Sequence, residues 1–192
     1  MSSCLDNENN LWLNYFPYGV IKISPEKQNA ELINLKSKSV EIHSLVEDMI
    51  ADNKGRIWMV LKGTGIAVYN MKDAAIKYLS TGDGLSNSNS TGIAKDDKGR
   101  IWVSSEGALD VIDAETFTVL NFSRRQGYPA NKLCAVQGDG QQLMLTGTDL
   151  FTFWNADEFL KSNNPYDVSI VSFRSEEHTS ELQSRFGISY AV

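Results

Sequence analysis

Few residues of this chain have the types and spacing that metal binding or covalent catalysis needs. The 192-residue sequence contains two histidines, His43 and His178, and two cysteines, Cys4 and Cys134. These four are far apart, whereas the ligands of a zinc site recur at short spacings. The turn at residues 52–55 lacks the acidic third ligand and the distal glutamate of a calcium loop. The sequence therefore predicts no metal site, no cofactor and no catalytic residue.

Non-covalent recognition of a sugar is the chemistry that the remaining candidates could support. Aromatic rings stack on sugar rings, and charged side chains bind the carboxylates or sulfates that sugars carry. The alternative for each candidate is an ordinary polar loop residue, and it stays open here. The loop residues that we expect to contact a ligand are Tyr15, Tyr18, Lys62, Asp83, Glu106, Arg125, Tyr128 and Asp149.

A stretch that occurs four times must position these loops. It reads DNENNLWL from Asp6, DNKGRIWMV from Asp52 and DDKGRIWVS from Asp96, and a degraded copy, GDGQQLML from Gly138, has lost its Arg and Trp. Trp12 and Trp58 are 46 residues apart, and Trp58 and Trp102 are 44 apart. A period of this length is the mark of a repeat architecture and must be settled before any other element.

Each copy is predicted to be a turn followed by a strand. Aspartate bonds the backbone ahead of it and glycine supplies a positive φ, which is turn chemistry. The residues after the turn, such as Ile57–Leu61, are apolar on both faces, as in a strand covered on both sides. We therefore expect the tryptophans to be packing residues between stacked sheets and not ligand platforms.

The pattern predicts four short strands in each repeat. In the second repeat they are residues 46–51, 57–61, 66–69 and 76–79, and residues 81–89 form a connecting loop. In the third repeat residues 101–103, 109–112 and 116–120 are expected strands, whereas the first has only residues 1–5 for its inner strand. Residues 155–161 are expected to form a helical turn. The predicted fold class is all-β: a partial β-propeller of about four blades, each a four-stranded antiparallel sheet, in an open arc.

The pattern Asp-x-x-Gly-Arg-Ile-Trp-Val, followed by a small turn, an apolar pair and Gly-Asp-Gly-Leu-Ser-Asn, resembles the two-component regulator propeller repeat. The resemblance covers about residues 6–155. It implies the periplasmic sensor region of Bacteroidetes hybrid histidine kinases, an oligosaccharide as the signal ligand, and control of a phosphorelay and of transcription. The partners it implies are the rest of the propeller, a C-terminal β-sandwich and a homodimer.

Domain boundaries follow from where the repeat ends. We expect a partial propeller over residues 1–162 and the start of a following β-sandwich over residues 163–173. The segment from Arg174 to Val192 has neither the repeat nor a strand period, and it resembles the translation of a sequencing adapter. We therefore expect residues 174–192 to be a non-native tail.

Charge and hydropathy exclude some function classes. The formal net charge is −6, which argues against nucleic acid as a partner. No apolar run approaches the ~20 residues of a membrane-spanning helix, and the N-terminal residues have no signal-peptide pattern. Two other readings stay open: a streptogramin-lyase-like propeller enzyme, and a scaffolding propeller that binds protein partners.

Overall fold

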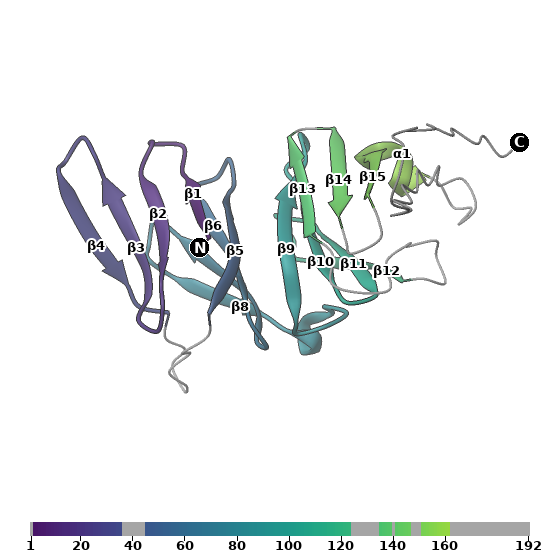
Figure 1. The fold of residues 1–192 in the computed structure, drawn as a ribbon, viewed down its shortest axis with the longest axis horizontal. Helices are drawn as coiled ribbons and strands as arrows, with labels where there is room; N and C mark the ends of the chain where they lie inside the picture. Colours follow the sequence, from purple (N-terminus) through teal and green to yellow (C-terminus); the bar gives the residue numbers. More distant parts are fainter. Residues whose placement is uncertain (1, 36–44, 124–134, 140, 147–150, 162–192) are drawn as a thin grey trace, which may run out of the picture.

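The computed structural model describes residues 2–35, 45–123, 135–139, 141–146 and 151–161. These residues form four antiparallel sheets, here called blades 1 to 4, which stand one after another along the chain with blades 1 and 4 at opposite ends (Figure 1). The inner strands β1, β5, β9 and β13 contact one another in that order. This arrangement confirms the predicted all-β, open propeller-type fold.

Every blade follows chain order, so that each strand pairs with the next one. Blade 1 comprises β1 (Ser3–Leu5), β2 (Leu11–Tyr15), β3 (Gly19–Ser24) and β4 (Asn29–Ile33). Blade 2 comprises β5 (Val46–Ala51), β6 (Arg56–Leu61), β7 (Gly65–Asn70) and β8 (Ile76–Leu79), and the short 3-10 helix η1 (Thr81–Asp83) follows it. Blade 3 comprises β9 (Ser90–Lys95), β10 (Ile101–Ser105), β11 (Ala108–Ile112) and β12 (Val119–Ser123).

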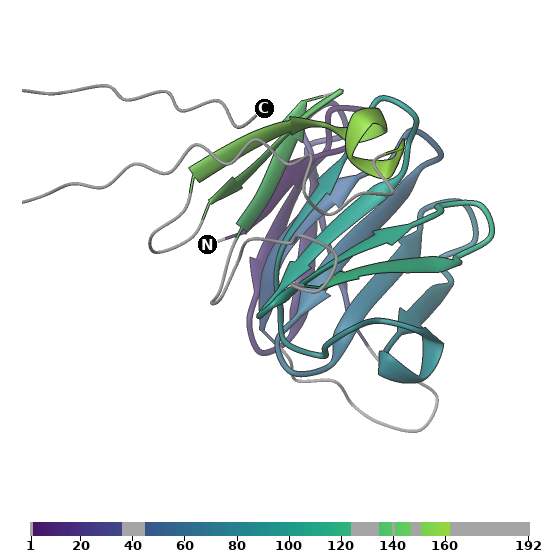
Figure 2. The same ribbon diagram turned by 90° about the vertical axis from the view of Figure 1, so that its right-hand side faces the viewer.

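Blade 4 departs from this plan. It has three described strands, β13 (Ala135–Asp139), β14 (Gln142–Thr146) and β15 (Phe151–Asn155), and the helix α1 (Ala156–Lys161) then follows directly (Figure 2). The Asn155 side chain accepts from the backbone N–H of Asp157 at 2.9 Å and of Glu158 at 3.1 Å, which caps the helix. The helix predicted at residues 155–161 is confirmed.

The strand predicted at residues 116–120 is wrong, because the fourth strand of blade 3 begins at Val119. The Asp113 carboxylate accepts from the backbone N–H groups of Glu115 and Thr116, both at 2.8 Å. Phe117 then has φ 61°, outside the strand region. An aspartate-capped turn thus holds these residues out of the sheet.

The register places each tryptophan and its neighbours on opposite faces of a blade. Trp12, Trp58 and Trp102 are 0% exposed and pack against the next blade, as predicted. Trp12 packs with the blade 2 residues Ile57 and Met59. The core therefore consists of interfaces between successive blades.

Part of the sequence prediction falls on residues 36–44, 124–134, 147–150 and 162–192, which lie outside the described residues. They include His43, Cys134, the expected β-sandwich start and the expected tail. Across the described ranges, no helix is both long and apolar enough to cross a membrane.

Candidate functional site

The blades present two kinds of turn at their two ends. The loops between second and third strands and the connections from a fourth strand to the next blade lie at one end, here called the loop face. The first turns, between first and second strands, lie at the other end with the third turns, here called the turn face. The described candidates, Tyr15, Tyr18, Lys62, Asp83 and Glu106, belong to the loop face, whereas the repeated Asp and Arg belong to the turn face.

The loop between β2 and β3 carries an exposed aromatic group. Tyr15, Phe16 and Tyr18 are 47%, 55% and 57% exposed. The rings of Tyr15 and Tyr18 lie 5.6 Å apart between centroids, with planes at 33°. The backbone N–H of Tyr18 donates to the carbonyl of Tyr15 at 2.8 Å, which holds the loop as a tight turn. The structure thus brings these two predicted residues together, with their rings available to a ligand.

Charged candidates occupy the equivalent loops of blades 2 and 3. Lys62 follows β6, and its ammonium group lies 3.5 Å from the carboxylate of Glu47. Glu106 is exposed in the turn between β10 and β11. The two side chains therefore share the loop face with the tyrosines, but each belongs to a different blade.

Asp83 has a structural role that the sequence pattern did not reveal. Its carboxylate accepts from the backbone N–H and the hydroxyl of Ser80, both at 2.9 Å, and so completes the cap of η1. A carboxylate used in this way has less capacity for a ligand. The remaining candidates, Arg125, Tyr128 and Asp149, lie outside the described residues.

On the turn face, each aspartate of the repeat holds its own tryptophan. The indole Nε1 atoms of Trp12, Trp58 and Trp102 donate to Asp6, Asp52 and Asp96 at 2.8, 2.9 and 2.9 Å. The three aspartates are at most 5% exposed. The six-residue spacing from Asp to Trp is therefore a hydrogen-bonding requirement, and a buried indole N–H needs such a partner.

Asp52 shows how the turn face stabilises a buried charge. Burial raises the pKa of this carboxyl, but hydrogen bonds from the Trp58 indole, the Arg56 and Lys54 backbone and the Arg56 side chain outweigh burial and lower its pKa below 3.8. The Arg56 Nε atom lies 2.5 Å from Asp52 Oδ2. The ionised form is thus the favoured form in the folded chain.

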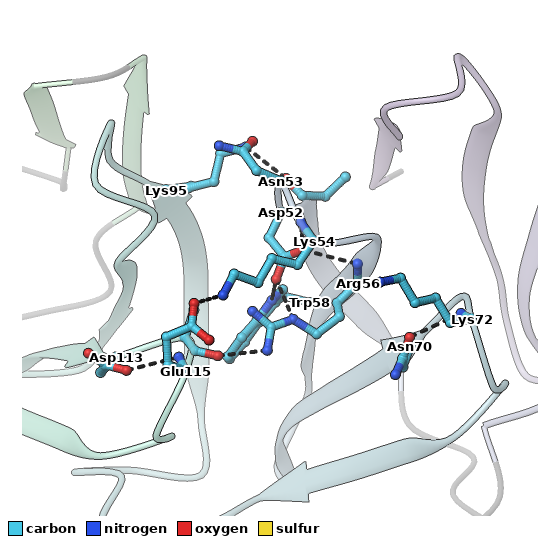
Figure 3. Close-up of polar contacts among 12 residues, drawn as sticks. Asp52, Asn53, Lys54, Arg56, Trp58, Asn70, Lys72, Lys95, Asp113 and Glu115 are labelled. Carbon is cyan, nitrogen blue, oxygen red and sulfur yellow. Dashed lines mark hydrogen bonds and ion pairs between the residues drawn. The ribbon is translucent and has the colours of Figure 1, made fainter.

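A charged cleft of about 170 Å³ lies on the turn face between blades 2 and 3 (Figure 3). Its walls are the first turns of both blades and the third turn of blade 3. Arg56 Nη1 donates to the carbonyl of Ala114 at 2.6 Å, and Lys54 pairs with Glu115. On another side, Lys95 Nζ donates to Asn53 Oδ1 at 2.9 Å. Because these charges pair across the blade boundary, the cleft is a junction between blades.

None of the charged residues of this cleft is among the candidates predicted from the sequence. The available signal is the repeated Lys-Gly-Arg of the first turn, which places cations at the same point of blades 2 and 3. At the next junction Arg100 Nη2 donates to Asp157 Oδ1 at 2.7 Å, and Lys98 lies 2.5 Å from Asp157 Oδ2. In the described part of the chain, no three His, Cys, Asp or Glu residues group as metal ligands would.

Comparisons with known proteins agree with this architecture. Residues 84–107 match the family model described as two component regulator propeller. This segment runs from the end of η1 through the first turn of blade 3 and the Trp102 strand. A search of curated proteins found no match.

Solved structures show the same fold at low sequence identity. The extracellular domain of a hybrid two component system from B. thetaiotaomicron matches 81% of this chain, with TM-score 0.67 and 17% identity. A second such domain from that bacterium matches 93%, with TM-score 0.64 and 12% identity. The β-propeller domain of Cps50 (Swd1) from Myceliophteria thermophila matches 91%, with TM-score 0.66 and 12% identity.

The match covers a limited part of each of those proteins. This chain spans 21% and 22% of the two extracellular domains and 57% of the Cps50 propeller domain. The repeat, the stacked blades and the family match lead to one conclusion. Residues 84–107 match the two-component regulator propeller repeat, and the chain around them has a β-propeller fold.

Proposed function

We propose that this chain is part of the extracytoplasmic sensor propeller of a hybrid two-component histidine kinase. The family match at residues 84–107 and the two similar extracellular domains support this role. The sensor is periplasmic in this proposal. Its ligand signal controls a phosphorelay and transcription through domains that lie outside this sequence.

We further propose that the ligand is an oligosaccharide held by the loop face. The observation that carries this proposal is the exposed pair Tyr15 and Tyr18, with ring centroids 5.6 Å apart, at the tip of the β2–β3 loop. Neither ring belongs to the buried core of the blades, because Tyr15 is 47% exposed and Tyr18 is 57% exposed. Their faces can stack on sugar rings, and Lys62 on the same face can meet a sugar carboxylate or sulfate.

The proposed role is non-catalytic. The buried carboxylates on the turn face, Asp6, Asp52 and Asp96, already accept hydrogen bonds from indole and backbone N–H groups. The Arg100 guanidinium is likewise bonded to Asp96 and Asp157. Groups committed in this way stabilise the blades and have little freedom to transfer protons.

Calorimetry of the 192-residue chain against neutral, uronic-acid and sulfated oligosaccharides tests the ligand class. Replacing both Tyr15 and Tyr18 by alanine should abolish the binding heat of the preferred sugar. Phe153→Ala is the matched control, because Phe153 is 55% exposed on another blade. It should leave the affinity unchanged.

Lys62→Ala distinguishes acidic from neutral sugars. It should lower the affinity for an acidic sugar and leave the affinity for a neutral sugar unchanged. Heat from a peptide or an antibiotic, with none from any sugar, would contradict the proposal. Turnover of a bound compound would instead favour the streptogramin-lyase-like alternative.

A further inference from the structure

The charged cleft between blades 2 and 3 contains hydrogen-bonding groups that its own ion pairs leave unused. Four basic and four acidic side chains line it, so the lining has no formal net charge. Most of these charges are paired, as Arg56 is with Asp52 and Lys54 is with Glu115. The groups that stay unpaired therefore decide what the cleft can bind.

Two guanidinium groups of the lining each have a nitrogen to spare. Arg100 donates from Nε to Asp96 and from Nη2 to Asp157, so its Nη1 bonds to no described residue. Arg56 uses Nε and Nη1 in the contacts given above, and its Nη2 is a buried donor without an acceptor among the described residues. A buried donor in this state needs a water or a ligand as its acceptor. Both walls of the cleft thus offer N–H groups, Arg56 from blade 2 and Arg100 from blade 3.

Two carboxylates of blade 3 are likewise available. Asp97 is exposed in the first turn and forms no hydrogen bond or ion pair with the described residues. Asp113 caps the third turn through Oδ1 alone, so its Oδ2 has no partner among them. Asp113 lies beside Glu115 on the same turn (Figure 3), but only Glu115 has a lysine opposite it. The cleft therefore carries two negative charges that no described cation pairs.

The size of the cleft excludes a large ligand. Its volume is about 170 Å³. A water molecule takes about 30 Å³ of the liquid, so this volume holds about five or six water-sized groups. Sites for larger ligands usually measure about 300–1,000 Å³. An oligosaccharide does not fit here, whereas a molecule of a few non-hydrogen atoms does.

Charge then selects among the small molecules. A simple anion would bond to the two arginines but would meet the unpaired Asp97 and Asp113. A simple cation would bond to these carboxylates but would meet the arginines. A zwitterion satisfies both pairs, because its carboxylate accepts from guanidinium groups while its ammonium group donates to carboxylates.

We propose that this cleft binds a free α-amino acid with a small side chain, such as alanine or serine. Its carboxylate accepts from Arg56 and Arg100, and its ammonium group donates to Asp97 and Asp113. The bound molecule contacts both blade 2 and blade 3, so it stabilises their junction. The site lies on the turn face, at the other end of the blades from the sugar site proposed above, so either proposal can fail without the other.

Calorimetry and thermal unfolding of the 192-residue chain with glycine, alanine and serine test the proposal. Because only the folded chain has the cleft, alanine at about 100 times its Kd should raise the thermal midpoint by about 5–10 °C. Propionate and ethylamine are the matched control ligands, since they equal alanine without its ammonium group and without its carboxylate. Each should bind at least about tenfold more weakly than alanine, as expected when a charge-assisted hydrogen bond is lost. Tryptophan should not bind, because it is too large for the cleft.

Substitutions that remove one charge show which residues hold the ammonium group. Asp97→Asn should lower the affinity for alanine about tenfold and should not weaken propionate. Asp113→Asn should do the same, since the asparagine side-chain oxygen can still cap the third turn. Glu26→Gln is the control, because Glu26 is an exposed acid on blade 1. This control and the double alanine variant of Tyr15 and Tyr18 should bind alanine as the unchanged chain does.

Three results would overturn the proposal. The first is the absence of binding heat from all of the small amino acids. The second is propionate or ethylamine that binds as tightly as alanine, since the cleft would then be a site for a simple ion. The third is an alanine affinity that neither Asp97→Asn nor Asp113→Asn lowers, since alanine would then bind elsewhere. If Asp113→Asn fails to fold, Asp97→Asn and the control ligands still decide the question.

Discussion

Phe117, in the third turn of blade 3, stacks on Trp58 of blade 2, with ring centroids 5.6 Å apart and planes at 27°. Each of the three described junctions has such a pair. Trp12 meets Tyr69 at 5.5 Å, and Trp102 meets Phe159 of α1 at 5.7 Å. The aromatic partner comes from a strand, a turn and a helix in turn. Each junction therefore contains an aromatic contact to the tryptophan, although a different type of element supplies the partner ring each time.

Removing the Phe117 ring should destabilise the junction between blades 2 and 3. Phe117→Ala should lower the free energy of unfolding by about 2 kcal/mol, since it deletes a partly buried ring and its stack on Trp58. Phe117→Gly should cost no more than the alanine variant, because φ is 61° and glycine tolerates a positive φ. Urea denaturation measures both. A glycine variant that is clearly less stable than the alanine variant would contradict the expectation that the positive φ of Phe117 strains the backbone.

The aspartate that holds the tryptophan should matter far more than its exposed neighbour in the repeat. Asp52→Ala leaves the buried Trp58 indole N–H and the Arg56 Nε–H without their acceptor, so we expect the free energy of unfolding to fall by about 3 kcal/mol. Asp97→Ala, an exposed position in the next first turn, should change stability by less than about 0.5 kcal/mol. Similar losses in the two variants would contradict the hydrogen-bonding role.

The pH dependence of stability should reflect the lowered pKa of Asp52. Because this pKa lies below 3.8 in the folded chain, the unfolded chain binds more protons in the window between the two values. The contribution is present above pH 3.8 and is lost as the pH falls through the folded pKa. As the pH is lowered through this window, the free energy of unfolding should therefore fall less steeply for Asp52→Asn than for the unchanged chain.

Asp48 supplies the control of opposite sign. Burial raises the pKa of Asp48 above 3.8, although hydrogen bonds from the backbone N–H of Ile93 and of Met49 oppose this shift. Its ionised form therefore disfavours folding above the unfolded pKa. In Asp48→Asn the free energy of unfolding should therefore fall more steeply as the pH is lowered. A change in the same direction as that of Asp52→Asn would contradict the opposite pKa shifts of the two residues.

Two glycines with positive φ should respond differently to alanine. Gly65 has φ 108°, and an added Cβ would lie 2.3 Å from the carbonyl oxygen of Leu79. Gly99 has φ 78° and no atom within 4 Å of an added Cβ. Gly99→Ala should cost about 1 kcal/mol from φ strain alone, and Gly65→Ala should cost clearly more because the backbone of β8 must move. Thermal unfolding of the two variants measures the difference, and equal costs would contradict the close approach.

The sequence by itself determined the repeat, the all-β class and most strand positions. These follow from local chemistry: an aspartate and a glycine form the first turn, and an apolar run after it forms a buried strand. The strands predicted in blade 2 agree with β5 to β8 to within one residue at each end. The buried role of the three tryptophans follows in the same way, because each occupies the same phase of the repeat.

Only the tertiary structure decided how the blades meet. Phe117 was predicted in a strand, but the Asp113 turn carries it onto Trp58 of the preceding blade. Asp83 was predicted to meet a ligand, but its carboxylate caps η1 through Ser80. These outcomes depend on which side chains approach from elsewhere in the chain. Local periodicity reports the face on which a residue lies, but it carries no information about the partner that reaches that face.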